Sequence, residues 1–201
     1  MREEVLQQLF YVKEFQVLIA ARTLLLNCLT SHYAPLWQEL FSDGFPTQCW
    51  AKRDHRLLDS HFSSLTPEWT PTSPLRTAFA RRQALLELDV LAAQALGLTL
   101  EELLTIYRIQ FPVFRDYERN TYYDQTGRIA YLGGDQGYGF STPEWKKIQN
   151  MTSGVVTRTI VDNTLPTGPV ERTIEYHAPF DPMNREADYA EAWAFFEAQP
   201  K

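Results

Sequence analysis

Residues 75–112, LRTAFARRQALLELDVLAAQALGLTLEELLTIYRIQFP, carry the clearest structural signal in the chain. Apolar residues recur at helical spacing as far as Gly97, a residue type that commonly follows the end of a helix. Thr99 and Glu102 then match a capping box, which predicts that a second helix starts directly afterwards. Pro112 is expected to end that helix. The stretch therefore predicts a helical hairpin with helices over 75–96 and 100–109.

Upstream of the hairpin, residues 3–42 also show apolar residues at helical spacing, with a break expected near 31–35. Residues 46–75 contain four prolines and are interpreted as a connector that can hold one short helix over 54–62. A connector of this length in a compact chain is either functional or packed over the surface.

Downstream of the hairpin, the pattern changes to short strands. NTYYDQTGRIAYL predicts two strands around a turn, and GVVTRTIVD and VERTIEYHA predict two more, joined by a loop over 165–169. Thr142-Pro143 predicts the start of a short helix, and Asp181-Pro182 the start of the last one. The prediction is an α+β fold, with N-terminal helices and a helical hairpin before a small antiparallel β-rich unit and a C-terminal helix. The expected segments, forming one compact domain overall, are 1–45, 46–75, 76–112 and 113–201.

The composition of the 201 residues is that of an ordinary globular protein, with 44% hydrophobic and 22% charged residues. A net charge of -6 counts mildly against autonomous DNA binding, because phosphate contacts need basic residues. Cys28 and Cys49 match no disulfide framework or metal spacing and are expected to be reduced thiols. The sequence begins with no secretory signal, and Arg22 interrupts its longest apolar stretch. These features predict a cytoplasmic protein that does not enter a membrane.

The glycine-rich stretch RIAYLGGDQGYGF, residues 128–140, contains a D-x-G-x-G of the kind that holds S-adenosylmethionine in many methyltransferases. The strand before it follows a hairpin turn, and no alternation of helix and strand follows to build a parallel sheet. Nor does the chain contain an Asn-Pro-Pro-Tyr or Asp-Pro-Pro-Tyr tetrapeptide. We therefore favour a turn, in which Gly133, Gly134, Gly137 and Gly139 serve the backbone. A small standalone methyltransferase using the 133–139 loop stays an alternative.

Other catalytic signatures are weaker. No G-K-[ST] of a nucleotide-binding loop is present, and no nucleophile elbow or Cys/His signature appears. The spacing of the histidines matches no zinc template. The sequence predicts no catalytic, cofactor or metal residues in this chain.

Basic residues interleave with tyrosines between residues 76 and 147, although residues 71–130 hold seven arginines and seven acidic residues and are neutral. Arginine and lysine can bind phosphates, and tyrosine can stack on bases. A positive face would therefore have to arise by segregation in space, and ion-paired, solvated helix faces are the alternative. The predicted DNA-facing residues are Arg81, Arg82, Arg115, Arg119, Tyr122, Lys146 and Lys147.

Three long segments are similar to a known family. LNCLTSHYAPLWQELF, SPLRTAFARRQALLELDVLAAQALGLTLEELLTIYRIQFPVFRDYERNTYYDQTGRIAY and GPVERTIEYHAPFDPMNREADYAEAWAFFE resemble the C-terminal region of large bacterial DNA methyltransferases. These enzymes belong to restriction-modification or phage-defence systems of the type IIG, BREX or DISARM kind. The resemblance covers roughly residues 23–198, and rests on long runs more than on a short motif.

The resemblance implies a noncatalytic DNA-recognition or scaffold module of an adenine-specific methyltransferase. The catalytic core that binds S-adenosylmethionine would lie in a parent or partner domain, so this chain would hold no cofactor itself. The implied partners are DNA and that core, or another defence-system subunit. An alternative is a protein-interaction module that docks through its first and last helices and never touches DNA, which the acidic C-terminal third of the chain favours.

Overall fold

A computed structural model describes residues 2–133 and 139–199, with side chains from Phe15 onward. The chain divides into two compact units. The helical unit comprises Met1–Pro112 and Asn184–Lys201, and the β unit comprises Val113–Met183. Long helices, small antiparallel sheets and a C-terminal helix confirm the predicted α+β class.

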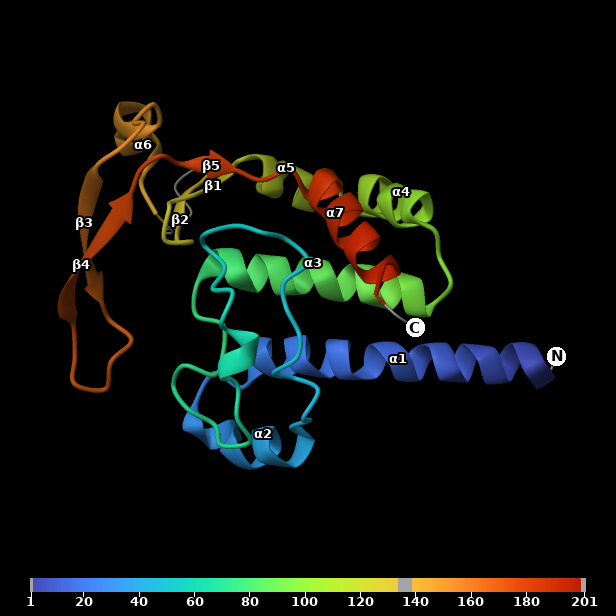
Figure 1. Cartoon of the computed structure of the whole chain (residues 1–201). Helices are drawn as coiled ribbons and strands as arrows, with labels where there is room; N and C mark the ends of the chain where they lie inside the picture. Colours follow the sequence, from blue (N-terminus) through green and yellow to red (C-terminus); the bar gives the residue numbers. More distant parts are fainter. Residues whose placement is uncertain (1, 134–138, 200–201) are drawn as a thin grey trace. The chain divides into compact units, whose positions relative to one another are not determined.

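Helix α3 (Ala78–Ala95) is the centre of the helical unit. It packs against α1 (Arg2–Asn27) and against α7 (Arg185–Glu197), as Figure 1 shows. Helix α4 (Leu100–Gln110) returns beside α7 and completes the predicted hairpin. The shared core includes Leu86, Val90, Leu91, Leu103, Leu104, Tyr107, Tyr189 and Phe196.

Local capping explains why the hairpin forms where the sequence predicts it. Thr77 caps α3 by accepting a hydrogen bond from the Ala80 amide, and Gly97 follows the helix with φ of 74°. Glu102 accepts hydrogen bonds from the Thr99 amide at 2.7 Å and from its hydroxyl at 2.8 Å, which confirms the capping box.

Pro112 lies just beyond the end of the predicted helix, and it also begins another helix. Helix α4 already ends at Gln110, and Pro112 is the first residue of another helix, α5 (Pro112–Arg119). Proline suits the first helical position, where its missing N–H would have no partner in the helix anyway. The residue therefore separates two helices.

The connector 46–75 is part of the core of the helical unit. Trp50, Leu57, Phe62 and Leu65 are buried, and helix α2 (Ala34–Leu40) attaches to the connector through the Trp37 indole, which donates to the Thr66 carbonyl at 2.9 Å. The helix expected over 54–62 does not form, and these residues make turns before a short 3₁₀ helix, Phe62–Ser64.

The side chain of Asp54 explains the missing helix. Its carboxylate accepts a hydrogen bond from the Arg56 amide at 3.0 Å and a second from the Arg56 guanidinium at 2.8 Å. Such a local side-chain contact favours a turn over a helix.

A buried ion pair joins α1 to α3 beneath this connector. The Arg22 guanidinium donates to the Glu87 carboxylate at 2.6 Å, and both side chains are fully buried. Glu87 also accepts hydrogen bonds from the Ala51 amide and the Gln83 side chain. Because these contacts satisfy the buried carboxylate, the pair fixes the connector against two helices.

The β unit contains two small antiparallel sheets. Strand β1 (Thr121–Tyr123) lies between β2 (Ile129–Leu132) and β5 (Asp181–Pro182). Strands β3 (Val155–Asp162) and β4 (Val170–His177) form the predicted second hairpin, paired from Val155 with His177 to Asp162 with Val170. Helix α6 (Thr142–Ile148) covers an aromatic core that includes Phe140, Trp145, Tyr176 and Phe180.

Asp124 holds the turn of the first hairpin. Its carboxylate is fully buried and accepts hydrogen bonds from the amides of Thr126 at 2.9 Å, Arg128 at 2.8 Å and His177 at 3.1 Å. The same side chain therefore shapes the Asp-Gln-Thr-Gly turn and ties it to β4.

The start of the last helix differs from the prediction. Asp181–Pro182 pairs with β1 as β5, and α7 begins at Arg185 after Asn184, whose side chain accepts from the Ala187 amide at 3.2 Å. The sequence also grouped this helix with residues 113–183, whereas its buried side chains belong to the helical unit. Among the helices described, none is long and apolar enough to cross a membrane.

Candidate nucleic-acid interface

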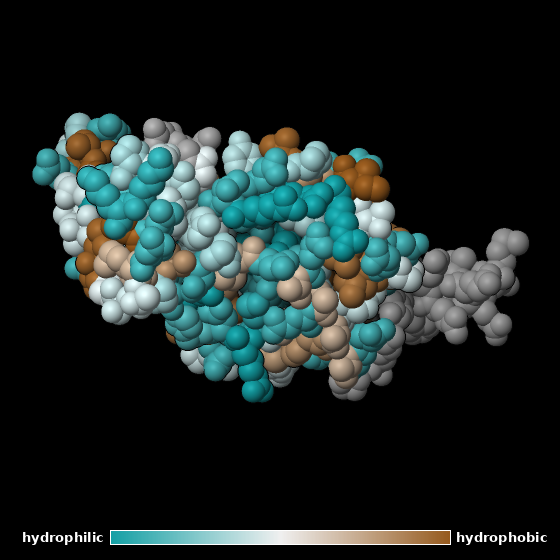
Figure 2. Space-filling model, turned by 90° about the horizontal axis from the view of Figure 1, so that it is seen from above, coloured by the Kyte–Doolittle hydropathy of each residue, from teal (hydrophilic) through white to brown (hydrophobic). Residues whose placement is uncertain are grey.

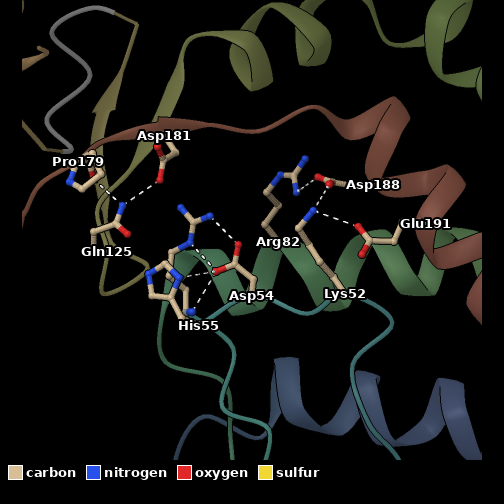
Figure 3. A network of polar contacts seen from close by, with 10 residues as sticks. Lys52, Asp54, His55, Arg82, Gln125, Pro179, Asp181, Asp188 and Glu191 are labelled. Carbon is tan, nitrogen blue, oxygen red and sulfur yellow. Dashed lines mark hydrogen bonds and ion pairs between the residues drawn. The ribbon is translucent and has the colours of Figure 1, made fainter. Parts of the chain in front are cut away.

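The two arginines predicted on α3 are engaged inside the helical unit. Arg82 is 6% exposed, and its guanidinium donates to the Asp188 carboxylate of α7 at 2.7 Å. Lys52 binds the same carboxylate at 2.6 Å and reaches Glu191 at 3.2 Å, as Figure 3 shows. Arg82 therefore belongs to the interior, not to a surface that could meet DNA.

Arg81 is half-buried and also has a structural contact. Its guanidinium donates to the Leu26 carbonyl at the end of α1, at 2.9 Å. This bond joins α1 to α3. The predicted pair of arginines thus holds helices together, and the remaining predicted residues all lie in the β unit.

Helix α6 presents two of those residues to solvent. The Ser141 amide and hydroxyl donate to Glu144 at 2.8 and 2.6 Å, and Pro143 occupies the first turn. Helix α6 buries Trp145, while Lys146 and Lys147 in its last turn are exposed. Lysines in this position also complement the negative end of the helix dipole.

Tyr122 has a different position from the one predicted. It is half-buried, and its ring lies 4.8 Å from that of Trp145. The Tyr131 ring also stacks on Trp145, with the two ring centroids 4.9 Å apart and an angle of 2° between the ring planes. These tyrosines hold α6 on the sheet, so their faces are already occupied by aromatic neighbours.

The two predicted arginines of α5 differ in exposure. Arg119 in the last turn is exposed, whereas Arg115 is half-buried and has an interaction partner within the chain. Of these two, Arg119 has the more open position for a phosphate contact.

The sequence did not select two further cations, Arg158, whose charge acts on Glu144 of α6, and Arg128, whose charge acts on Tyr176 of β4. The hydrogen bonds from the side chain and backbone of Ser141 lower the pKa of Glu144, and the positive charges of Arg158 and Lys147 lower it further. Burial raises the pKa of Tyr176, which the charges of Arg158 and Arg128 partly oppose. We call Arg128, Lys146, Lys147 and Arg158 the α6 basic cluster.

The basic cluster arises by segregation, because the β unit as a whole is slightly acidic. Its sequence holds seven Arg or Lys and nine Asp or Glu residues. Several of these acids have local partners: Asp124 is buried, Glu144 caps α6, and Asp162 lies 2.9 Å from Arg172. In the part of the chain that the structure describes, no side chain of the basic cluster forms a hydrogen bond or ion pair.

The described residues show no preformed metal centre. Their His, Cys, Asp and Glu side chains form no group of three or more that could hold a metal ion. The two cysteines are free thiols, and Cys28 is buried whereas Cys49 is exposed.

The D-x-G-x-G stretch falls mostly on residues 134–138, outside the described residues, but its flanks are informative. A Cβ on Gly139 would lie 2.0 Å from the Ala130 carbonyl oxygen, and its φ of 64° also favours glycine. The Phe140 amide donates to that carbonyl at 2.7 Å. Glycine at 139 therefore has a backbone reason that involves no cofactor.

Exposed apolar side chains offer a second kind of surface. In the helical unit they include Ile106, Ile109 and Phe111, which are 41%, 66% and 50% exposed. On the face shown in Figure 2, hydrophobic residues form separate groups among hydrophilic ones.

Comparison with known proteins identifies no relative of this chain. No protein-family model, curated protein or solved structure matches it.

Proposed function

We propose that this chain is a noncatalytic DNA-recognition or scaffold module of an adenine-specific methyltransferase in bacterial phage defence or restriction-modification. It acts in the cytoplasm beside a methyltransferase core or another defence subunit. That core, not this chain, binds S-adenosylmethionine. The resemblance of the long sequence runs supports the enzyme class.

The observation that carries DNA contact is the α6 basic cluster. Lys146 and Lys147 lie on α6, Arg158 lies on β3 and Arg128 lies in the turn before β2, and Trp145 of α6 stacks on Tyr131 of β2. Lysine and arginine side chains without internal partners can bind successive phosphates, and such contacts fix the register of a protein on DNA. This geometry favours positioning on the backbone over reading of base edges.

Titration of a fluorescent DNA duplex with the full chain tests the proposal. Low salt suits the assay, because electrostatic affinity is then greatest. Replacing Lys146 and Lys147 with glutamine should weaken binding and reduce the slope of log affinity against log salt by about 2, since each lost phosphate contact contributes about 1.

The matched control carries Arg53→Gln and Arg76→Gln, which remove the same charge from exposed positions of the helical unit. The control should retain the wild-type salt slope. Absence of measurable binding at low salt, or equal losses in the two double variants, would reject DNA contact through α6.

The second candidate, a protein-interaction module, is favoured by the exposed apolar residues of α4. Helix α7 is a poor docking element, because Tyr189, Ala192 and Phe196 are buried in the helical unit. Replacing Ile106 and Ile109 with glutamate should abolish association with a methyltransferase core and leave DNA titrations unchanged if this candidate holds. Unchanged association would reject it.

A further inference from the structure

The sheet of β3 and β4 has an open edge along β3. The two strands pair over eight residues each, and in the part of the chain that the structure describes no other strand joins them. Figure 1 shows them side by side as a hairpin. A two-stranded hairpin is marginally stable in water, and further strands stabilise such a sheet. A third strand on one edge would therefore stabilise this sheet.

The register shows which backbone groups of β3 point to the open edge. Directly beside the ladder, the Ala178 amide donates to the Gly154 carbonyl at 2.9 Å. The next pair is Val155 with His177, and the His177 amide donates away from β3, to the Asp124 carboxylate at 3.1 Å. Hydrogen-bonded and non-hydrogen-bonded pairs alternate along an antiparallel ladder. Every second residue of β3 therefore directs its amide and carbonyl outward, and these residues are Val155, Thr157, Thr159 and Val161.

These four outward residues favour the addition of a strand. Their side chains are exposed, and no hydrogen bond from another described residue reaches their amides or carbonyls. All four are β-branched and uncharged, and such residues favour extended strands. Edges that avoid pairing usually carry charged residues, prolines or bulges, none of which occurs at these four positions. An extended polypeptide presents amides and carbonyls at the matching spacing, so a β-strand is the ligand that fits this edge.

The outer edge of β4 is protected by comparison. Its outward residues are Glu171, Thr173, Glu175 and His177, of which two are acidic. The backbone of His177 is already bonded, because Asp124 accepts from its amide and the Gln125 amide donates to its carbonyl at 2.9 Å. Charged residues on an edge oppose further pairing. A strand that adds to β3 is therefore not followed by another on β4.

The β3 sequence is complementary to itself in the antiparallel direction. When Thr159 of two copies lie opposite each other, outward residues face outward residues, and Arg158 of one copy faces Ile160 of the other. Arg158 and Asp162 are the charged residues of β3. In this register each Arg158 has the other Arg158 and one Asp162 as diagonal neighbours, so that the charges balance. A register centred on Arg158 would instead place like charges directly opposite, which is unfavourable.

We propose that two copies of this chain pair through their β3 edges, antiparallel and centred on Thr159, to form one continuous sheet with both β3 strands in the middle. The assembly closes, because both copies use the same edge and the protected β4 edges lie outside. Eight residues from each copy are fewer than the roughly 20–30 of a standard interface, so the association is weak and depends on concentration. The pairing requires neither DNA nor a methyltransferase core.

Sedimentation velocity of the full chain without DNA tests the pairing. The sedimentation coefficient should rise with concentration from about 1 μM to about 1 mM, the range of weak association, and level off at the value of a dimer. Hydrogen exchange at both ends of this range locates the interface. The outward β3 amides of Thr157 and Thr159 should exchange about tenfold more slowly at high concentration, while the outward β4 amide of Thr173 should not change.

Thr159→Pro and Thr173→Pro are a matched pair of variants. The two threonines are opposite each other in the ladder, their hydroxyls are 3.2 Å apart, and both amides point outward. Either proline therefore removes the same side-chain contact and no hydrogen bond between β3 and β4. Thr159→Pro should weaken the association at least about tenfold, because a β3 amide and the fit of the second copy are lost. Thr173→Pro should associate like the wild type.

Three results would overturn the proposal: a monomer at every concentration, equal association of the two folded proline variants, or slowed exchange of Thr173 in place of Thr157 and Thr159. Assembly beyond a dimer would also reject the closed pair. Slowed exchange that appears only when a different polypeptide is added would assign the edge to that polypeptide and reject pairing between copies. The exchange measurement uses the wild-type chain, so it decides the question even if a proline variant does not fold.

Discussion

Gly139 shows how a single residue in a motif-like stretch can be required by packing alone. Its left-handed backbone and the nearby Ala130 carbonyl leave no room for a side chain. The last glycine of the D-x-G-x-G pattern is therefore explained by local backbone packing.

Gly139→Ala should lower the free energy of unfolding of the β unit by about 3 kcal/mol or more. The alanine would have an unfavourable positive φ, and its Cβ would also clash with the Ala130 carbonyl. Gly168→Ala is the control, since Gly168 also has positive φ, at 98°, but nothing within 4 Å of an added Cβ. Its cost should stay near 1 kcal/mol. Chemical denaturation followed by a probe in the β unit measures both; equal losses would contradict the clash.

His61 gives the helical unit a dependence on pH. Burial lowers the pKa of its imidazole, and a hydrogen bond with the Ser73 backbone opposes this shift only in part. The folded state therefore holds His61 neutral, while the unfolded chain binds a proton below about pH 6.5. The free energy of unfolding should fall as the pH drops below that value, until the lowered folded pKa is passed.

Denaturation between pH 7.5 and 5 measures this dependence, and His61→Gln should make it shallower. His55→Gln is the matched control, because the His55 side chain is 61% exposed. Equal pH dependence in wild type and His61→Gln would show that the imidazole is not the titrating group.

At the scale of elements, charged residues dock α7 on the helical unit. Asp188 binds both Arg82 and Lys52, and Arg82 is buried. The carboxylate therefore supplies a negative charge to a buried cation.

Asp188→Asn should lower the free energy of unfolding of the helical unit by about 3 kcal/mol, because the buried Arg82 loses the negative charge of the Asp188 carboxylate. Glu191 is the outer partner of Lys52, and its side chain is 46% exposed. Glu191→Gln should therefore lower the free energy of unfolding by less than about 1 kcal/mol. Thermal and chemical denaturation distinguish the two variants, and similar losses would argue against a special role for Asp188.

Elements with local signals were the predictable ones. Gly97, Thr99 and Glu102 define the α3–α4 hairpin from within a few residues, so the sequence located it well. Asp181–Pro182 resembles a helix start equally well, yet pairing with β1 makes it a strand. That partner lies far away in the chain, and no local pattern reveals it.

The candidate interface shows the same limit. Arg81 and Arg82 look like Lys146 and Lys147 in sequence, as adjacent cations on a helix. They differ because Arg82 binds Asp188, 106 positions further on, and Arg81 binds the Leu26 carbonyl at the end of α1. Arg128 and Arg158 are far apart in sequence, and only the folded β unit brings the charges of both to act on Tyr176.

At the scale of the molecule, the β unit is an insertion between two segments of the helical unit. Replacing residues 113–183 with a flexible Gly/Ser linker should leave the helical unit folded, because its core draws on residues before and after the insertion. Circular dichroism and a cooperative thermal transition measure this outcome. A molten helical unit would show that the two units depend on each other.

The place of α7 also constrains the order in which the chain can fold during synthesis. Tyr189, Ala192 and Phe196 complete the core of the helical unit but leave the ribosome after the whole β unit. While the β unit folds, the nascent helical unit therefore still lacks α7, and the apolar surface of α3 that α7 covers stays exposed. Chaperones that shield apolar surface would act on the nascent chain during this interval, when residues 113–183 have emerged and α7 has not.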